Sequence, residues 1–116
     1  MTPIERAKRF SRIKDIGCIA CRAYAGVWTY PEIHHQNLGG YAGKPRLGDE
    51  YTIGLCVWHH QGKPINGYTM ADCEQALGPS MKLQSKRFRE QFGRDERLLL
   101  VQNQLIAQAE RRVVGR

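Results

Sequence analysis

The chain has 116 residues, a formal net charge of +7 at pH 7 and a pI of about 9.5. This length suits one domain, or one small domain with tails, and the hydrophobic content of 41% excludes wholesale disorder. No apolar run is long enough to span a membrane. The basic balance favours a polyanionic partner, with nucleic acid first and an anionic membrane surface second.

The amino-terminal sequence carries no secretion signal. Residues 1–6 lack the apolar segment of a signal peptide, so we expect a cytoplasmic protein. The four cysteines then stay reduced. Closely spaced reduced thiols are more often metal-binding or redox-active than disulfide-bonded.

Residues 1–16 are predicted to form a basic amino-terminal helix or arm that precedes a domain of residues 17–116. Thr2 suits the N-cap position, Pro3 the first turn, and Glu5 the reciprocal contact of a capping box. The cations of this helix are Arg6, Lys8, Arg9, Arg12 and Lys14. They form either an ordinary solvated face or an arm that contacts phosphates.

Two short clusters place soft metal ligands at a spacing that zinc prefers. Cys18 and Cys21 stand three residues apart in a predicted tight turn, and Cys56 and His59 form a second pair at the same spacing. The alternatives for the first pair are a redox dithiol or two buried thiols, but the sequence around it lacks the βαβ pattern of a redox motif. We therefore predict a zinc site built from these four residues.

All four histidines occur in two adjacent pairs, at 34–35 and 59–60. His34 and His35 end a predicted strand of residues 27–35, in which alternation points the two side chains to opposite sides. One could bind a metal while the other faces a substrate. The alternative is that they are polar residues of the core.

A loop of residues 36–50 is expected to join this strand to a second one at 51–55. Lys44 and Arg46 give the loop a basic edge that suits a phosphate backbone. The second strand leads directly into the Cys56 cluster.

The second half of the chain predicts three helices with recognisable capping residues. They span residues 69–77, 81–92 and 96–114, and their caps are Thr69, Ser80 and Asp95. The buried side of the middle helix is marked by Leu83, Phe88 and Phe92. Cys73, within the first of them, is predicted to be a small buried hydrophobe rather than a ligand.

Together these clusters resemble the HNH endonuclease superfamily, whose members share a ββα-metal fold that is often braced by a structural zinc. The chain is most similar to the recombination enhancement function (Ref) nucleases of phages. The matching motifs are Gly17-Cys18-Ile19-Ala20-Cys21-Arg22, Pro31-Glu32-Ile33-His34-His35, Leu55-Cys56-x-x-His59-His60 and Phe88-x-x-x-Phe92-Gly93. The resemblance implies an α+β fold class: a small zinc-braced HNH (ββα-metal) domain with flanking helices.

The resemblance also implies roles for individual residues. The structural Zn²⁺ would be held by Cys18, Cys21, Cys56 and His59. His34 would bind the catalytic Mg²⁺ or Mn²⁺, with His60 and Asp49 as further ligands. His35 would be the general base that activates water.

The implied activity is hydrolysis of phosphodiester bonds in single- or double-stranded DNA. By the same resemblance a RecA filament would be a further partner, in the cytoplasm of a bacterium that carries the phage or prophage. The basic residues expected to contact DNA are Lys44, Arg46, Lys82, Lys86 and Arg89.

One position departs from the Ref pattern. That pattern places a metal-binding His near the start of the helix before Phe88, but Lys82 stands there and no His follows His60. A lysine repels a divalent cation unless it loses its proton, which favours an impaired catalytic site. The second hypothesis is therefore a non-catalytic zinc-containing module that binds DNA or a protein partner.

Overall fold

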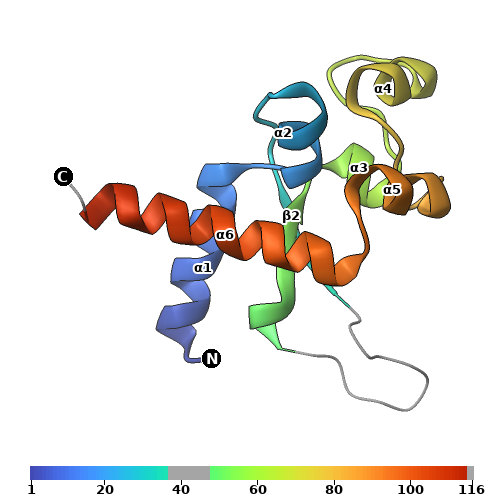
Figure 1. Cartoon of the computed structure of the whole chain (residues 1–116). Coiled ribbons are helices and arrows are strands. Elements are labelled where there is room, and N and C mark those ends of the chain that lie inside the picture. The colour runs from blue at the N-terminus through green and yellow to red at the C-terminus, as the bar shows by residue number, and fades with distance from the viewer. Residues whose placement is uncertain (37–47, 115–116) are drawn as a thin grey trace, which may run out of the picture.

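A computed structural model describes residues 1–36 and 48–114 and shows a two-stranded sheet surrounded by helices (Figure 1). In chain order the elements are α1 (Pro3–Ile16), α2 (Ile19–Ala25), β1 (Glu32–His35), the 3-10 turn η1 (Asp49–Tyr51), β2 (Thr52–Leu55), α3 (Val57–Gln61), α4 (Met70–Leu77), α5 (Ser85–Phe92) and α6 (Asp95–Val114). The chain is thus a small α+β protein, as the sequence predicts. None of the described helices has the length and apolar character that crossing a bilayer requires.

Two of the predicted helices begin where their capping residues indicate. Thr2 and Glu5 form a complete capping box at the start of α1, and Thr69 and Asp72 form another at the start of α4. In each box a side chain accepts a hydrogen bond from a backbone N–H that would otherwise lack a partner in the first turn. Local sequence therefore determines both starts.

Cys18 and Cys56 begin helices rather than turns. The expected tight turn at residues 18–21 is the first turn of α2, with Cys18 as its N-cap. The Sγ atom of Cys18 accepts a hydrogen bond from the Cys21 N–H at 3.3 Å. Cys56 caps α3 in the same way, with its Sγ atom accepting a hydrogen bond from the backbone N–H of His59 at 3.5 Å. Both halves of the predicted zinc site therefore have the same local structure, a helix whose first turn is capped by a cysteine sulfur.

The predicted strand at 27–35 is much shorter in the structure. β1 spans only Glu32–His35 and pairs antiparallel with β2, with Glu32 opposite Leu55 and His35 opposite Thr52. Residues before Glu32 have no strand partner because β2 ends at Leu55, where Cys56 begins α3. The predicted second strand is shorter by one residue, since Tyr51 belongs to η1.

The predicted helix at 81–92 starts later than expected, at Ser85. The Ser80 hydroxyl accepts hydrogen bonds from the Lys82 and Leu83 N–H groups, so it closes a turn of residues 81–83 instead of a helix. Leu83 is 50% exposed and does not belong to the core. Phe88 is buried as predicted, and Phe92 packs partly buried against the core.

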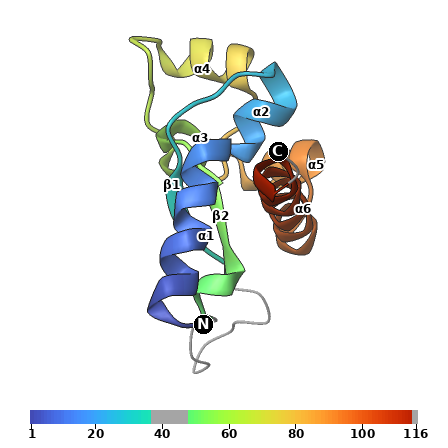
Figure 2. The same ribbon diagram turned by 90° about the vertical axis from the view of Figure 1, so that its left-hand side faces the viewer.

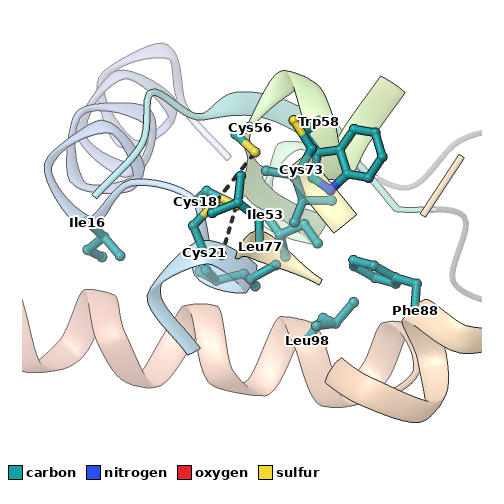
Figure 3. Packing of buried hydrophobic residues seen from close by; sticks show 13 residues of the cluster. Ile16, Cys18, Cys21, Ile53, Cys56, Trp58, Cys73, Leu77, Phe88 and Leu98 are labelled. Atoms are coloured by element: carbon teal, nitrogen blue, oxygen red, sulfur yellow. Dashed lines mark hydrogen bonds between the residues drawn. The ribbon is translucent and has the colours of Figure 1, made fainter. Parts of the chain in front are cut away.

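The core lies where α2, β2, α3 and α6 meet (Figure 3). Its large side chains are Ile53, Leu55, Trp58, Phe88 and Leu98. The three thiols at 18, 21 and 56 lie in the same cluster, as does Cys73, which is buried as predicted. α1 and α6 pack against each other and against β2 (Figure 2).

Candidate metal centre and neighbouring histidines

The four predicted zinc ligands converge at the N-terminal ends of α2 and α3. The Nδ1 atom of His59 lies 3.4 Å from the Sγ atom of Cys18, 3.5 Å from that of Cys21 and 3.3 Å from that of Cys56. The sulfurs of Cys21 and Cys56 are 3.6 Å apart, and all four residues are buried. Figure 3 shows the three cysteine side chains pointing toward one another.

These distances suit one tetrahedral ion. With Zn–S bonds of about 2.3 Å, the ligand atoms of a tetrahedral site stand roughly 3.5–3.8 Å apart. The Nε2 atom of His59 donates to the Leu77 carbonyl at 2.7 Å, which directs Nδ1 at the three sulfurs. Cys18, Cys21, Cys56 and His59 therefore form a buried group that could hold a metal such as zinc.

Protons are divided unevenly within this centre. Hydrogen bonds to Cys18 and Cys56 raise the pKa of the Cys21 thiol, whereas hydrogen bonds from Cys18 and Cys21 hold the pKa of Cys56 far below its ordinary value. Burial lowers the pKa of His59, but hydrogen bonds to Cys18 and Cys56 outweigh burial and raise this pKa to about 9. A cation bound here would displace the protons of His59 and Cys21.

A second cluster lies between β1 and α3. The Nδ1 atom of His34 is 3.2 Å from the Nε2 atom of His60, and the Nδ1 atom of His60 donates to a Glu32 carboxylate oxygen at 3.0 Å. Gln61 donates to both oxygens of the same carboxylate, at 2.7 and 2.9 Å. The carboxylate thereby fixes the His60 ring, with its Nε2 atom facing His34.

His35 points to the other side of β1, as strand alternation requires. Its Nε2 atom donates to a carboxylate oxygen of Asp49 at 2.8 Å, and its ring meets the Phe10 ring edge-on. Arg6 lies 3.8 Å from the other Asp49 oxygen. The structure thus brings Asp49 to His35, whereas His34 and His60 face each other.

Of the residues predicted to contact DNA, three lie in the described part of the chain. Lys82, Lys86 and Arg89 are exposed in the turn before α5 and on α5 itself, where Lys86 and Arg89 line a shallow depression with Arg94. Lys44 and Arg46 fall outside the described residues. The described part of this group is therefore a basic, solvent-facing surface.

Sequence reasoning did not identify Glu32 and Gln61 as site residues. A signal for Glu32 existed, because Glu32 and His34 are two positions apart on a strand and must share a face. Gln61 had no such signal, since its contact depends on how α3 crosses β1. Among the described residues, only the Cys18 group assembles three or more His, Cys, Asp or Glu ligand atoms closely enough to enclose an ion.

The fold and this buried Cys₃His group define a small α+β protein built around a candidate metal centre. Residues 2–107 match the family model described as "Recombination enhancement, RecA-dependent nuclease". The chain belongs to this family, which confirms the predicted likeness to recombination enhancement nucleases and indicates a nuclease, hence an enzyme. No curated protein and no solved structure matches the chain.

Proposed function

We propose that the protein is a metal-dependent DNA endonuclease of the HNH type that acts with a RecA filament in phage recombination, in the bacterial cytoplasm. The observation that carries this proposal is that the two histidines of β1 face opposite sides of the strand and have different partners. His34 faces His60 in the last turn of α3, while His35 on the opposite side is held by Asp49. The family description supports both the nuclease activity and the role of RecA.

The buried Cys₃His group is proposed as a structural zinc site. It joins the starts of α2 and α3, and α3 carries His60 one residue after the ligand His59. A zinc ion there would fix the position of α3 relative to β1. The distance between His34 and His60 would then be set by the zinc ion and its ligands rather than by the short helix α3 alone.

His34 and His60 are proposed to hold the catalytic ion. Their facing nitrogens are 3.2 Å apart, close to the spacing of about 3 Å between adjacent ligands of an octahedral Mg²⁺. Mg²⁺ or Mn²⁺ bound there would polarise the scissile phosphate and stabilise the leaving oxygen. Asp49, expected as a third ligand, is proposed instead to orient His35, because its carboxylate bonds that ring.

His35 is proposed as the general base. Its Nε2–H donates to Asp49, which leaves the lone pair of Nδ1 to take a proton from the attacking water. The carboxylate stabilises the imidazolium that this transfer forms. Arg6 lies 3.8 Å from the other oxygen of the same carboxylate.

The test is plasmid nicking and cleavage of single-stranded DNA with Mg²⁺ or Mn²⁺, with and without RecA filaments. Replacing His35 with Ala removes the base and should lower the cleavage rate by about 10²- to 10⁴-fold. Zinc content should stay unchanged, because His35 contacts none of the four zinc ligands. Thermal unfolding should change only by the loss of the Asp49 hydrogen bond and the Phe10 contact. Equal behaviour of wild type and His35→Ala under every condition would overturn the nuclease proposal.

Lys82 supports a second candidate, a non-catalytic zinc module that binds DNA or a protein partner. This lysine is exposed in the turn before α5, at a position where the nuclease pattern carries a metal-binding His. On this reading the wild type binds DNA but does not cut it with any metal or with RecA. Strong cutting that depends on His35 would exclude this candidate.

A further inference from the structure

Two aromatic side chains stand out on the segment that joins α2 to β1. Trp28 is 57% exposed and Tyr30 is 61% exposed, which makes them the most exposed aromatic residues in the described part of the chain. Their ring centroids are 6.5 Å apart and their planes are nearly perpendicular, at 85°. Exposed aromatic pairs of this kind are uncommon on a protein surface unless something binds there.

The indole ring of Trp28 is held in place although much of it faces solvent. Its Nε1–H donates to the Lys14 carbonyl at the end of α1, at 3.2 Å. A Cβ atom on Gly17 would lie 2.5 Å from the ring, so the glycine lets the indole pack closely against the chain. The Cys18 N–H also donates to the Thr29 carbonyl, which anchors the segment between the two rings. A ring fixed in this way loses little conformational entropy when a ligand binds.

The helix that supports Trp28 carries an excess of positive charge. Helix α1, whose end supports Trp28, carries five cations and only two carboxylates, Glu5 and Asp15. Arg6 and Arg12 have carboxylate partners, but no carboxylate among the described residues pairs with Lys8 or Lys14. Aromatic faces beside unneutralised cations are the combination that binds unpaired bases and their phosphates.

The position of the pair relates it to the candidate catalytic site. Tyr30 precedes Glu32, the residue that fixes His60, by two positions. Figure 2 shows the connecting segment descending from α2 directly into β1. A strand that contacts the two rings would therefore lie beside the start of β1, the strand that carries His34 and His35.

We propose that Trp28 and Tyr30 form a stacking site for an unpaired base of a DNA strand that enters the candidate catalytic site. The inference rests on the proposed function for the identity of the strand, but the binding itself needs neither cleavage nor a catalytic ion. The rings stack on bases without sequence preference, while cations of α1 contact the phosphates.

Intrinsic fluorescence gives a direct test, because the chain has two tryptophans in very different settings. Trp58 is 1% exposed and donates its N–H to the Gly78 carbonyl, so a base cannot reach it. Without added Mg²⁺ or Mn²⁺, oligothymidylate should quench the emission of Trp28 and leave that of Trp58. An abasic strand of the same length has the same phosphates and should bind without this quenching. Equal quenching by both strands, or none by either, would overturn the proposal.

Variants provide the second readout. Trp28→Ala, and separately Tyr30→Ala, should weaken binding of oligothymidylate by about five- to 150-fold and leave binding of the abasic strand unchanged. Tyr68→Ala is the matched control, since Tyr68 is also exposed but precedes α4 in a different part of the fold. Zinc content should be equal in all variants.

Three results would contradict the stacking site. Trp28→Ala could leave oligothymidylate binding unchanged, or it could weaken both strands equally. It could also break up a dimer of the wild type while strand binding persists, which would make the pair a protein interface. Loss of cleavage alone bears only on the proposed nuclease function, because the stacking measurements contain no cleavage step.

Discussion

On the proposed function, the Glu32 carboxylate would position one half of the candidate catalytic site without binding the ion itself. It accepts hydrogen bonds from the His60 ring and from the Gln61 amide. The first bond selects the tautomer in which Nε2 of His60 carries a lone pair directed at His34. Glu32 is thus a positioning residue, whose effect should appear in metal affinity rather than in the chemical step.

Replacing Glu32 with Ala should raise the Mn²⁺ concentration needed for half-maximal cleavage by about 10- to 100-fold, since outer-shell partners of metal ligands have effects of this size. Cleavage at saturating Mn²⁺ should largely recover. Glu32→Gln is the control, because its amide oxygen can still accept the His60 hydrogen bond and the shift should be smaller. A drop that excess Mn²⁺ does not restore would contradict the positioning role.

The four ligands of the Cys₃His centre could be predicted from the sequence, whereas the contacts of Glu32 and Asp49 could not. The cysteines and His59 occur in pairs at fixed short spacing, so local sequence already places each pair at one helix start. The partner of Glu32 depends on where α3 crosses β1. The partner of Asp49 depends on how η1 returns beside His35. Both depend on packing between segments that are distant in sequence.

At the scale of elements, the two capping boxes were predictable, whereas the length of strand pairing and the start of α5 were not. Thr2 and Thr69 start their helices as expected, because a capping box involves only neighbouring residues. β1 is shorter than predicted because its partner strand ends at Leu55, where the next residue, Cys56, caps α3. α5 begins late because Ser80 closes a local turn instead.

Gly54 marks the place where three elements come together. Its N–H donates to the buried Gln102 side chain of α6, and a Cβ atom there would lie 2.7 Å from the Ile13 side chain of α1 and 3.0 Å from Pro31. Gly54→Ala should therefore lower the free energy of unfolding by about 1–3 kcal/mol through overpacking. Denaturant unfolding measures this loss.

The double variant Ile13→Ala/Gly54→Ala tests the cause of that loss. Removing the Ile13 side chain creates space for the new methyl group. The double variant should therefore lose less stability than the sum of the losses of the two single variants. Strict additivity would mean that the strain arises elsewhere than between α1 and β2.

For the whole molecule, the candidate metal centre joins segments from the sheet, the core and the helices around them. α2 and α3 contribute the ligands, and the Leu77 carbonyl at the end of α4 holds the His59 ring. Binding of structural zinc contributes about 10–16 kcal/mol in small zinc-dependent domains, which is comparable to the whole stability of an ordinary domain of about 5–15 kcal/mol. The fold of this chain should therefore depend on the ion.

Cys18→Ser removes a ligand of the proposed zinc but keeps a hydroxyl that can cap α2, so purified protein should contain less than one zinc per chain and should unfold at a much lower temperature. Cys73→Ala is the matched control, because Cys73 is equally buried but lies outside the four-residue group. It should keep its zinc and lose less stability. Metal analysis and thermal unfolding of the two variants, with and without a chelator, measure both effects. If Cys18→Ser retained full zinc and melted with the wild type, the ion would not be what holds α2, α3 and α4 together.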